Sequence, residues 1–189
     1  MSATQILRQE HEAILKMLDA TEEVAGRLQA NETVSPEILG GLLKFFRLFA
    51  DRCHHGNEED LLFPLLEQKG MPRDGGPVGA MLLEHEQGRK LIQQMSKAES
   101  DYSQGRVGAG PLWAEAASGY VELLRQHIFK ENNILFVMAE RMLSANEQEL
   151  LSEAFEKNER EKMGLGTHER LHADMDQLLA SIWNRALVE

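Results

Sequence analysis

The residues of this chain that could do chemistry are histidines and glutamates that recur in two similar halves. Each half reads Glu-His-Glu and, some forty residues later, His-x3-Glu. The two halves are offset by 74 residues at the first histidine and by 73 at the second, which makes them an internal repeat. The residues concerned are His11, His54, Glu58, His85, His127 and Glu131. Two matching halves predict a site of approximate twofold symmetry, which suits a pair of metal ions.

Helix geometry places each His-x3-Glu pair on one face. His54 and Glu58 are four residues apart, as are His127 and Glu131, so each pair points the same way from a helix. The neighbouring positions on those faces are apolar. A glutamate on an apolar stripe is costly unless its charge is compensated, and a divalent metal compensates it directly.

Imidazole and carboxylate ligands suit iron, manganese or zinc, and the absence of thiolates argues against a structural zinc finger. Carboxylates that bridge two metals are characteristic of di-iron and di-manganese sites in helical bundles. Four histidines and two bridging glutamates leave coordination positions open for an oxo or hydroxo bridge, water, O2, NO or peroxide. The ligand types therefore predict two metal ions and leave iron, manganese and zinc open.

The elements that must position these residues are helices. The hydrophobic pattern is helical throughout, and glycine, proline and capping residues divide it. The predicted helices are 4–30, 36–69, 77–104, 111–143, 145–163 and 167–186, with a kink or irregular turn near Pro64. The fold class is therefore all-α: an antiparallel up-down-up-down four-helix bundle over residues 1–143 and one or two additional helices over residues 144–189, packed on the bundle.

The gaps between the histidines agree with this arrangement. They are 43 residues from His11 to His54, 31 from His54 to His85 and 42 from His85 to His127. A long, short, long series is what an antiparallel bundle requires when all the ligands lie at one level nearer one end. The six groups can therefore meet.

Composition limits the cellular setting and the partners. A net charge of -11 argues against nucleic acid and anionic membranes as partners, because both would repel the chain. No apolar run approaches the ~20 residues needed to span a bilayer. The first twelve residues contain acids and a histidine, unlike a signal peptide, so we expect a cytoplasmic protein, monomeric or homodimeric. The single cysteine, Cys53, excludes an internal disulfide and is interpreted as a small buried hydrophobe rather than a ligand.

At the His and Glu positions the sequence resembles the hemerythrin-like family, whose members carry the HHE cation-binding domain. The match covers roughly residues 5–140, and HHGNEEDLLFP and HIFKENNILF are especially similar to bacterial members linked to the repair of damaged iron centres. The resemblance implies a non-haem di-iron centre inside a four-helix bundle, ligated by the six residues named above. Family roles include oxygen carriage, sensing of oxygen, nitric oxide or iron, and stress defence.

Two positions depart from the oxygen carriers of the family. Those proteins have a second histidine four residues after the one in the third helix, where this chain has Arg89. They also have an aspartate in the fourth helix, where this chain has Glu131. Reversible oxygen storage is therefore disfavoured, and a reactive or sensing site is expected.

The last predicted helix contains two more histidines. His168 to His172 matches the H-E-x-x-H pattern of zinc proteases, but an all-helical chain offers no sheet edge for a peptide, so a protease is disfavoured. Either His168 (favoured) or His172 reaches over the bundle to supply the missing fifth histidine, or both are polar surface residues. His55 and Glu59 point about 100° away from the first pair and are interpreted as neighbours. Tyr120 either hydrogen-bonds a metal-bound ligand or packs.

The sequence therefore predicts a di-iron protein that senses, stores or detoxifies O2, NO or peroxide, or handles iron. The alternative is an enzyme of oxidative or nitrosative stress defence, acting by peroxide turnover or iron-centre repair. A third reading is a helical interaction protein with a structural metal. Whether the chain is an enzyme stays open.

Overall fold

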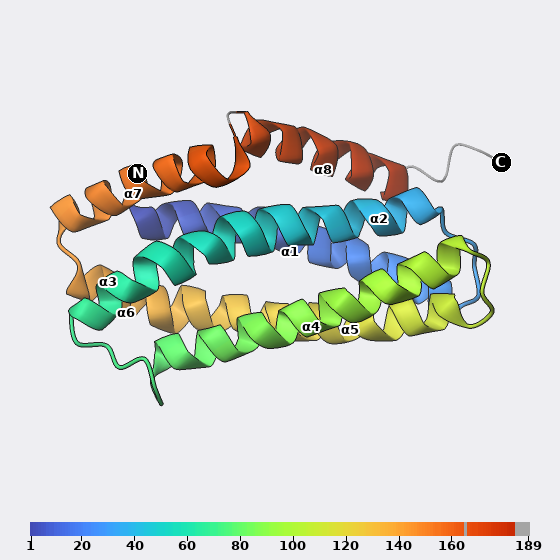
Figure 1. Cartoon of the computed structure of the whole chain (residues 1–189), viewed down its shortest axis with the longest axis horizontal. Coiled ribbons are helices and arrows are strands. Elements are labelled where there is room, and N and C mark those ends of the chain that lie inside the picture. The colour runs from blue at the N-terminus through green and yellow to red at the C-terminus, as the bar shows by residue number, and fades with distance from the viewer. Residues whose placement is uncertain (165, 184–189) are drawn as a thin grey trace.

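The computed structural model describes residues 1–164 and 166–183, apart from the side chains of residues 163, 168 and 169, and this part of the chain is helical without any strand (Figure 1). The α-helices are α1 (Ala3–Gln29), α2 (Pro36–Phe45), α3 (Phe63–Gln68), α4 (Pro77–Ser103), α5 (Ala109–Lys130), α6 (Phe136–Met142), α7 (Ala145–Met163) and α8 (Thr167–Trp183). Three π-helical segments interrupt them: η1 (Phe46–His55), η2 (Glu58–Leu62) and η3 (Glu131–Leu135). The all-α prediction is confirmed.

The helix ends follow the capping signals of the sequence. Ser144 accepts a hydrogen bond from the backbone of Glu147, whose side chain accepts one in return, which is the predicted capping box of α7. Ser35 caps α2 directly before Pro36. Where the structure describes a predicted helix end, that end lies within two residues of its predicted position. Residues 184–186, predicted as the end of the last helix, lie outside the described residues.

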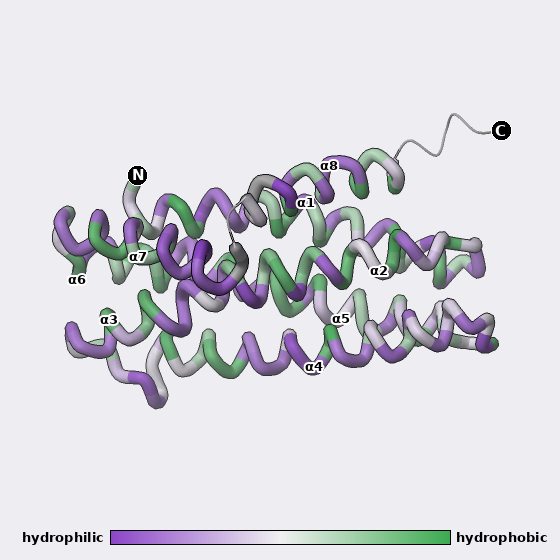
Figure 2. Tube along the Cα trace, turned by 45° about the horizontal axis from the view of Figure 1, so that its top comes forward, coloured by the Kyte–Doolittle hydropathy of each residue, from purple (hydrophilic) through white to green (hydrophobic). Residues whose placement is uncertain are grey.

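The long helices run along one axis, with α7 and α8 along one side (Figure 1). α5 packs against both α4 and α1, and α2 packs against α4. α7 contacts α1, η1 and η2, while α8 contacts α2 and α1. Hydrophobic and hydrophilic residues both recur along these helices, as expected of amphipathic helices that bury one face (Figure 2). None of the described helices combines the length and apolar character needed to cross a membrane.

Two apolar clusters form the core, and the His and Glu residues lie between them along the chain. The larger cluster contains Phe46 and Trp113, whereas the smaller one contains Leu7, Phe63 and Phe136. On α1, for example, Leu7 belongs to the smaller cluster and Ile14 to the larger, with His11 between. The polar residues thus form a layer nearer one end of the molecule, as the gaps between the histidines predicted.

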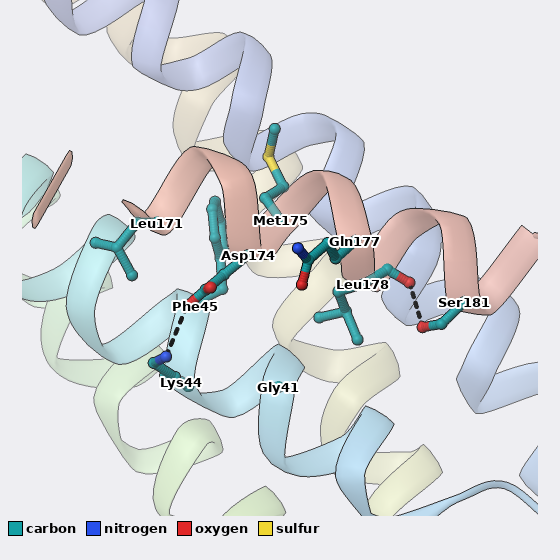
Figure 3. Close-up of a pocket in the computed structure, with 9 residues that line it drawn as sticks. All are labelled: Gly41, Lys44, Phe45, Leu171, Asp174, Met175, Gln177, Leu178 and Ser181. Atoms are coloured by element: carbon teal, nitrogen blue, oxygen red, sulfur yellow. Dashed lines mark hydrogen bonds and ion pairs between the residues drawn. The ribbon is translucent and has the colours of Figure 1, made fainter. Parts of the chain in front are cut away.

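α8 is held on the outside of α2 at a glycine. A Cβ at Gly41 would come within 3.0 Å of a methyl carbon of Leu178, so the small residue allows the close approach. Beside this contact, Lys44 and Asp174 form an ion pair at 2.7 Å across a cavity of ≈ 350 Å³ (Figure 3). None of the six ligands predicted from the repeat lines this cavity.

The π-helical segments lie at the predicted metal-ligating residues. η2 and η3 begin at Glu58 and Glu131, which are equivalent positions of the repeat. The irregular turn expected near Pro64 is confirmed by η2, but the equivalent position in the second half is Val137, so the proline alone does not cause it. η1 has no counterpart in the second half, where α5 continues as a regular helix to Lys130. π-Helical turns are rare and occur frequently at functional sites.

Candidate metal centre

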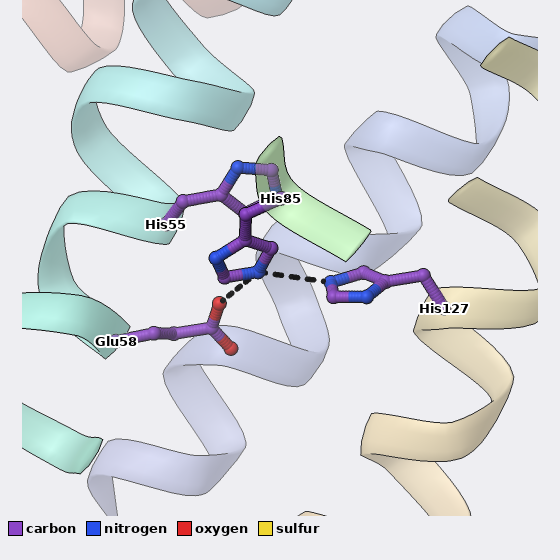
Figure 4. A group of neighbouring side chains, drawn as sticks. All are labelled: His55, Glu58, His85 and His127. Carbon is purple, nitrogen blue, oxygen red and sulfur yellow. Dashed lines mark hydrogen bonds and ion pairs between the residues drawn. The ribbon is translucent and has the colours of Figure 1, made fainter. Parts of the chain in front are cut away.

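The structure brings the six predicted side chains together in the core, each at most 1% exposed. Their donor atoms fall into two groups within which all atoms lie within 4.8 Å of one another. The groups are His11, His54, Glu58 and Glu131 on one side and His55, Glu58, His85 and His127 on the other (Figure 4). Glu58 belongs to both groups, so its carboxylate lies between them.

The Nε2 atoms and carboxylates face one another at short distances. Nε2 of His85 lies 3.1 Å from Nε2 of His127 and 3.5 Å from a carboxylate oxygen of Glu58. In the other group, Nε2 of His11 lies 3.1 Å from a carboxylate oxygen of Glu131. Imidazole and carboxylate donors therefore converge on a small volume.

Each histidine of the two groups is held from behind through its Nδ1 atom, which donates to an oxygen acceptor. The pairs are His11 with Asn132 (2.9 Å), His54 with Glu10 (2.7 Å), His55 with Asp51 (3.4 Å), His85 with Glu59 (2.7 Å) and His127 with Glu84 (3.0 Å). Such a bond keeps the proton of the neutral ring on Nδ1 and leaves the lone pair of Nε2 free to bind a metal. This is the usual arrangement of a metal-bound histidine.

The residues that accept the hydrogen bonds from Nδ1 follow the sequence repeat. Glu10 precedes His11 and holds His54, and Glu84 precedes His85 and holds His127. The first glutamate of each Glu-His-Glu triplet thus orients the histidine of the other helix in its half.

The residue after each core glutamate holds a histidine of the opposite half. Glu59 accepts from His85, and Asn132 accepts from His11. The repeat continues with aromatic rings, because Phe63 stacks on His85 and Phe136 stacks on His11, with ring centroids 5.9 and 5.5 Å apart.

The centre contains buried polar atoms that have no hydrogen-bond partner within the protein. They are Nε2 of His11 and His54 and both carboxylate oxygens of Glu58 and of Glu131. Burying such groups without partners is expensive, and more so when they are charged. A pair of cations would satisfy all of them, so the residues present fit a metal centre.

The two core glutamates are electrostatically unequal in the metal-free protein. Burial, followed by the neighbouring Glu131 carboxylate, raises the pKa of Glu58 well above its ordinary value. Burial also acts to raise the pKa of Glu131, but His127 and His11 hold it well below its ordinary value. Both carboxylates can be ionised together only if further positive charge enters the site.

The histidines also differ in protonation. Burial, followed by the neighbouring His11, lowers the pKa of His54 well below its ordinary value, which favours the neutral ring that binds metals. Burial acts in the same direction at His127, but Glu131 and Glu84 outweigh it and raise the pKa of His127 to about 9. A metal at His127 must therefore displace a proton near neutral pH.

His55 is the functional residue that the sequence interpretation missed. It was expected to point away from the centre, but it is 4% exposed and its ring stacks on that of His85 at 3.8 Å. That expectation assumed the rotation of a regular α-helix, whereas η1 ends at His55 and its wider turn rotates less per residue. The available signal was the second His-x3-Glu pair, His55 and Glu59, because Glu59 holds His85.

Arg89 takes part in an ion-pair network at the edge of the centre. It donates to Asp51 and to Glu59, each at 2.8 Å. Burial acts to raise the pKa of Asp51, but its hydrogen bonds with His55 and Arg89 lower that pKa to about 2. The pKa of Glu59 is likewise lowered to about 2, against the effect of burial, by His85 and Arg89. Arg89 therefore supports the outer acceptors of two histidines.

A cavity of ≈ 220 Å³ adjoins the centre on the same side. His55, His85 and Arg89 are among its lining residues, with Gly88 and Tyr120 on its wall. Tyr120 packs edge-on against Phe46, with ring centroids 4.8 Å apart, which corresponds to the packing role considered from the sequence. The exposed residues Arg47 and Gln93 also line the cavity, so it connects the centre with the surface.

The remaining candidates are His168, His172 and Cys53. The side chain of His168 lies outside the described residues, so its predicted role as a fifth ligand stays a prediction. His172 packs edge-on against Phe49 at 5.3 Å between ring centroids and belongs to neither group. Cys53 is 4% exposed, and burial raises the pKa of its thiol, in agreement with its interpretation as a small buried hydrophobe.

The model of the family described as the hemerythrin HHE cation-binding domain matches residues 2–139. The chain belongs to this family. The hemerythrin domain thus extends from α1 into α6 and contains all the residues of both groups. The resemblance found in the sequence is confirmed.

Relatives of this hemerythrin domain include an uncharacterized protein of Mycobacterium tuberculosis, 26% identical over 87% of this chain and 64% of its own length. The iron-sulfur cluster repair protein YtfE of Edwardsiella ictaluri is 31% identical over 69% of this chain and 60% of its own length. YtfE of Escherichia coli O81 is 29% identical over 55% of this chain and 49% of its own length. The chain spans less than two thirds of the length of these curated relatives.

Proposed function

We propose that this hemerythrin domain holds two iron ions and uses them to sense, store or detoxify a small ligand such as O2, NO or peroxide. The observation that carries the proposal is the set of buried imidazole and carboxylate atoms without partners at the centre. A pair of cations gives those atoms their missing partners and balances the charge of two buried glutamates.

The two groups of donors support a division of the ligands between the two ions. His11 and His54 would hold one ion and His85 and His127 the other. Glu58 would bridge, since its carboxylate belongs to both groups. Glu131 would bridge as well, because its carboxylate lies 3.1 Å from Nε2 of His11 and 3.2 Å from Nε2 of His127. When bound, an iron pair with open coordination positions can take up a small ligand and exchange electrons with it. The chain itself orients the imidazoles and excludes bulk water from the donor atoms.

The cavity beside His85 supports the proposal that the ligand is small. At ≈ 220 Å³ it has room for a diatomic molecule or peroxide and leads from Arg47 and Gln93 toward the centre. Phe46, Ile92 and the ring of Tyr120 form the apolar part of its wall. We propose that the ligand enters by this route.

The architecture that we propose for the domain is the antiparallel four-helix bundle over residues 1–143, with residues 144–189 as an appended helical extension. The contacts of α5 with α1 and α4, and of α2 with α4, support the bundle. The position of α7 and α8 along one side supports the extension (Figure 1).

A second candidate function is an enzyme of stress defence, either turning over peroxide or repairing iron centres. The repair alternative is favoured by the relatives named as iron-sulfur cluster repair proteins, which match 69% and 55% of this chain. Steady-state turnover of peroxide or NO by the iron-loaded protein would favour an enzyme. Stoichiometric binding without turnover favours a sensor or store.

The first experiment is metal analysis of protein purified without oxygen, with optical spectra before and after addition of O2 or NO. We expect about two iron ions per chain and a spectral change on addition of either gas. Trace metal only, in protein that is folded and iron-supplied, would contradict the proposal. Full function with zinc in place of iron would favour a structural metal.

A further inference from the structure

Neither the sequence pattern nor the proposed set of six ligands includes His55. We infer that His55 is a fifth imidazole ligand, which binds through Nε2 to the ion that His85 and His127 hold. The inference rests on the proposed function, because it concerns the same metal pair.

The position of the ring is the first argument. A donor atom of His55 lies within 4.8 Å of donor atoms of Glu58, His85 and His127, as expected of ligands around one metal ion. Figure 4 shows these side chains converging from different helices. His55 is also nearly as buried as the other members, at 4% exposure.

The hydrogen bond behind the ring is the second argument. Nδ1 of His55 faces a carboxylate oxygen of Asp51 at 3.4 Å, so His55 follows the pattern of the other histidines of the centre. Asp51 is itself fixed by Arg89. A carboxylate behind Nδ1 leaves Nε2 free as a donor and orients it, which is what a metal-binding imidazole requires.

The backbone gives the third argument. η1 is the π-helical segment that the second half lacks, and it ends at His55. At the equivalent position of the second half a regular helix carries Ile128, which cannot bind a metal. The irregular backbone and the extra donor thus occur together, and they make one ion richer in imidazole than the other.

The competing explanation is that His55 only packs against His85. The variants His55→Phe and His55→Ala separate the two roles, because phenylalanine keeps an aromatic ring for the stack and lacks the donor atom. His172→Phe is the matched control, since it makes the same exchange at a histidine that belongs to neither group. Circular dichroism and thermal unfolding of the metal-free proteins would verify that each variant folds.

The readout is anaerobic titration with Fe²⁺, followed by Mössbauer spectroscopy, and a parallel titration with Co²⁺ followed by its absorption spectrum. For the wild type and His172→Phe we expect two ions in unlike environments. For both His55 variants we expect about a tenfold or larger loss of affinity at one of the two ions and a change in its spectrum. Free imidazole added to His55→Ala should restore the Co²⁺ spectrum toward that of the wild type.

The outcomes distinguish the inference from the function on which it rests. Two ions bound to both His55 variants with wild-type affinity and spectra would overturn the role of His55 alone. Trace metal in the wild type would overturn the proposed function as well. A loss of affinity in His55→Ala that His55→Phe fully reverses would show that packing is sufficient, and would also overturn the role of His55 as a ligand.

Discussion

The two halves of the centre share a framework but differ in their surroundings. In both halves a glutamate before the first histidine orients the second, a π-helical turn begins at the core glutamate, and a phenylalanine stacks on a histidine. The differences around His85 lie at four equivalent pairs of positions: Asp51 and Leu124, His55 and Ile128, Glu59 and Asn132, and Arg89 and Leu15.

At every one of these pairs, the residue near His85 is ionisable and its equivalent is neutral. The cavity that reaches the surface also adjoins His85. The repeat therefore supplies the six-residue frame, and a few local substitutions surround His85 with ionisable side chains beside an open cavity. On the side of His11, Arg8 contacts Asn132 at the position equivalent to Leu82. We expect the two metal positions to behave differently.

The largest expected effect separates the two core glutamates. Glu58→Ala should abolish binding of both ions, because the Glu58 carboxylate belongs to both donor groups. Glu131→Ala should weaken both ions less than Glu58→Ala does, because Glu131 contacts His11 and His127 but lies outside the group that contains His55. Metal content after anaerobic loading measures both effects, and equal losses in the two variants would contradict this asymmetry.

A smaller effect is expected at the carboxylates behind the histidines. Glu10→Gln and Glu84→Gln should each lower metal affinity by about 10- to 100-fold, the usual effect of removing such a partner. The loss of affinity should be larger for Glu10→Gln, because the Glu10 side chain is more buried than that of Glu84. The two side chains are 8% and 16% exposed. Competition titrations with a chelator would measure the affinities, and a larger loss at Glu84 would reverse the order.

A kinetic effect is expected at the cavity. A Cβ at Gly88 would lie 3.4 Å from the ring of Tyr120, an approach that is tight but feasible, so Gly88→Val should fold and narrow the cavity. We expect NO to bind several-fold more slowly with unchanged metal content, measured by stopped-flow absorption.

The control for the cavity is Gly119→Val. A Cβ there would lie 3.4 Å from Leu91, an equally close contact, but Gly119 does not line this cavity. Equal rates in the two variants would show that ligands reach the centre by another route.

The smallest effect concerns acid stability. The pKa values of Asp51 and Glu59 are lowered to about 2 each, so the ionised carboxylates stabilise the fold at any pH above their ordinary pKa values near 4. This stabilisation is lost as the pH falls toward 2. Arg89→Gln should raise both pKa values and shift acid unfolding of the metal-free protein to slightly higher pH. The shift should be small because these side chains are partly exposed. Circular dichroism against pH measures it, and an unchanged midpoint would contradict the role of Arg89.

Much of the fold and of the candidate site could be predicted because the pattern repeats. Nearly equal offsets between His11 and His85 and between His54 and His127 identify the core residues, and the apolar stripes identify the helices. His55 could not be placed, because its direction depends on a π-helical segment and sequence periodicity assumes a regular helix. The contact of Glu59 with His85 joins different helices, so it depends on their packing and not on local spacing.

The partnerless carboxylate oxygens of Glu58 and Glu131 also have a thermodynamic consequence. An ion that binds them in the folded chain but not in the unfolded one stabilises the fold by about 2.7 kcal/mol when its free concentration is a hundred times its Kd. For the proposed iron pair, the fraction of unfolded chain, on which proteases act, should therefore fall as iron becomes available. The abundance of this protein in a cell should follow the supply of iron even at a constant rate of synthesis.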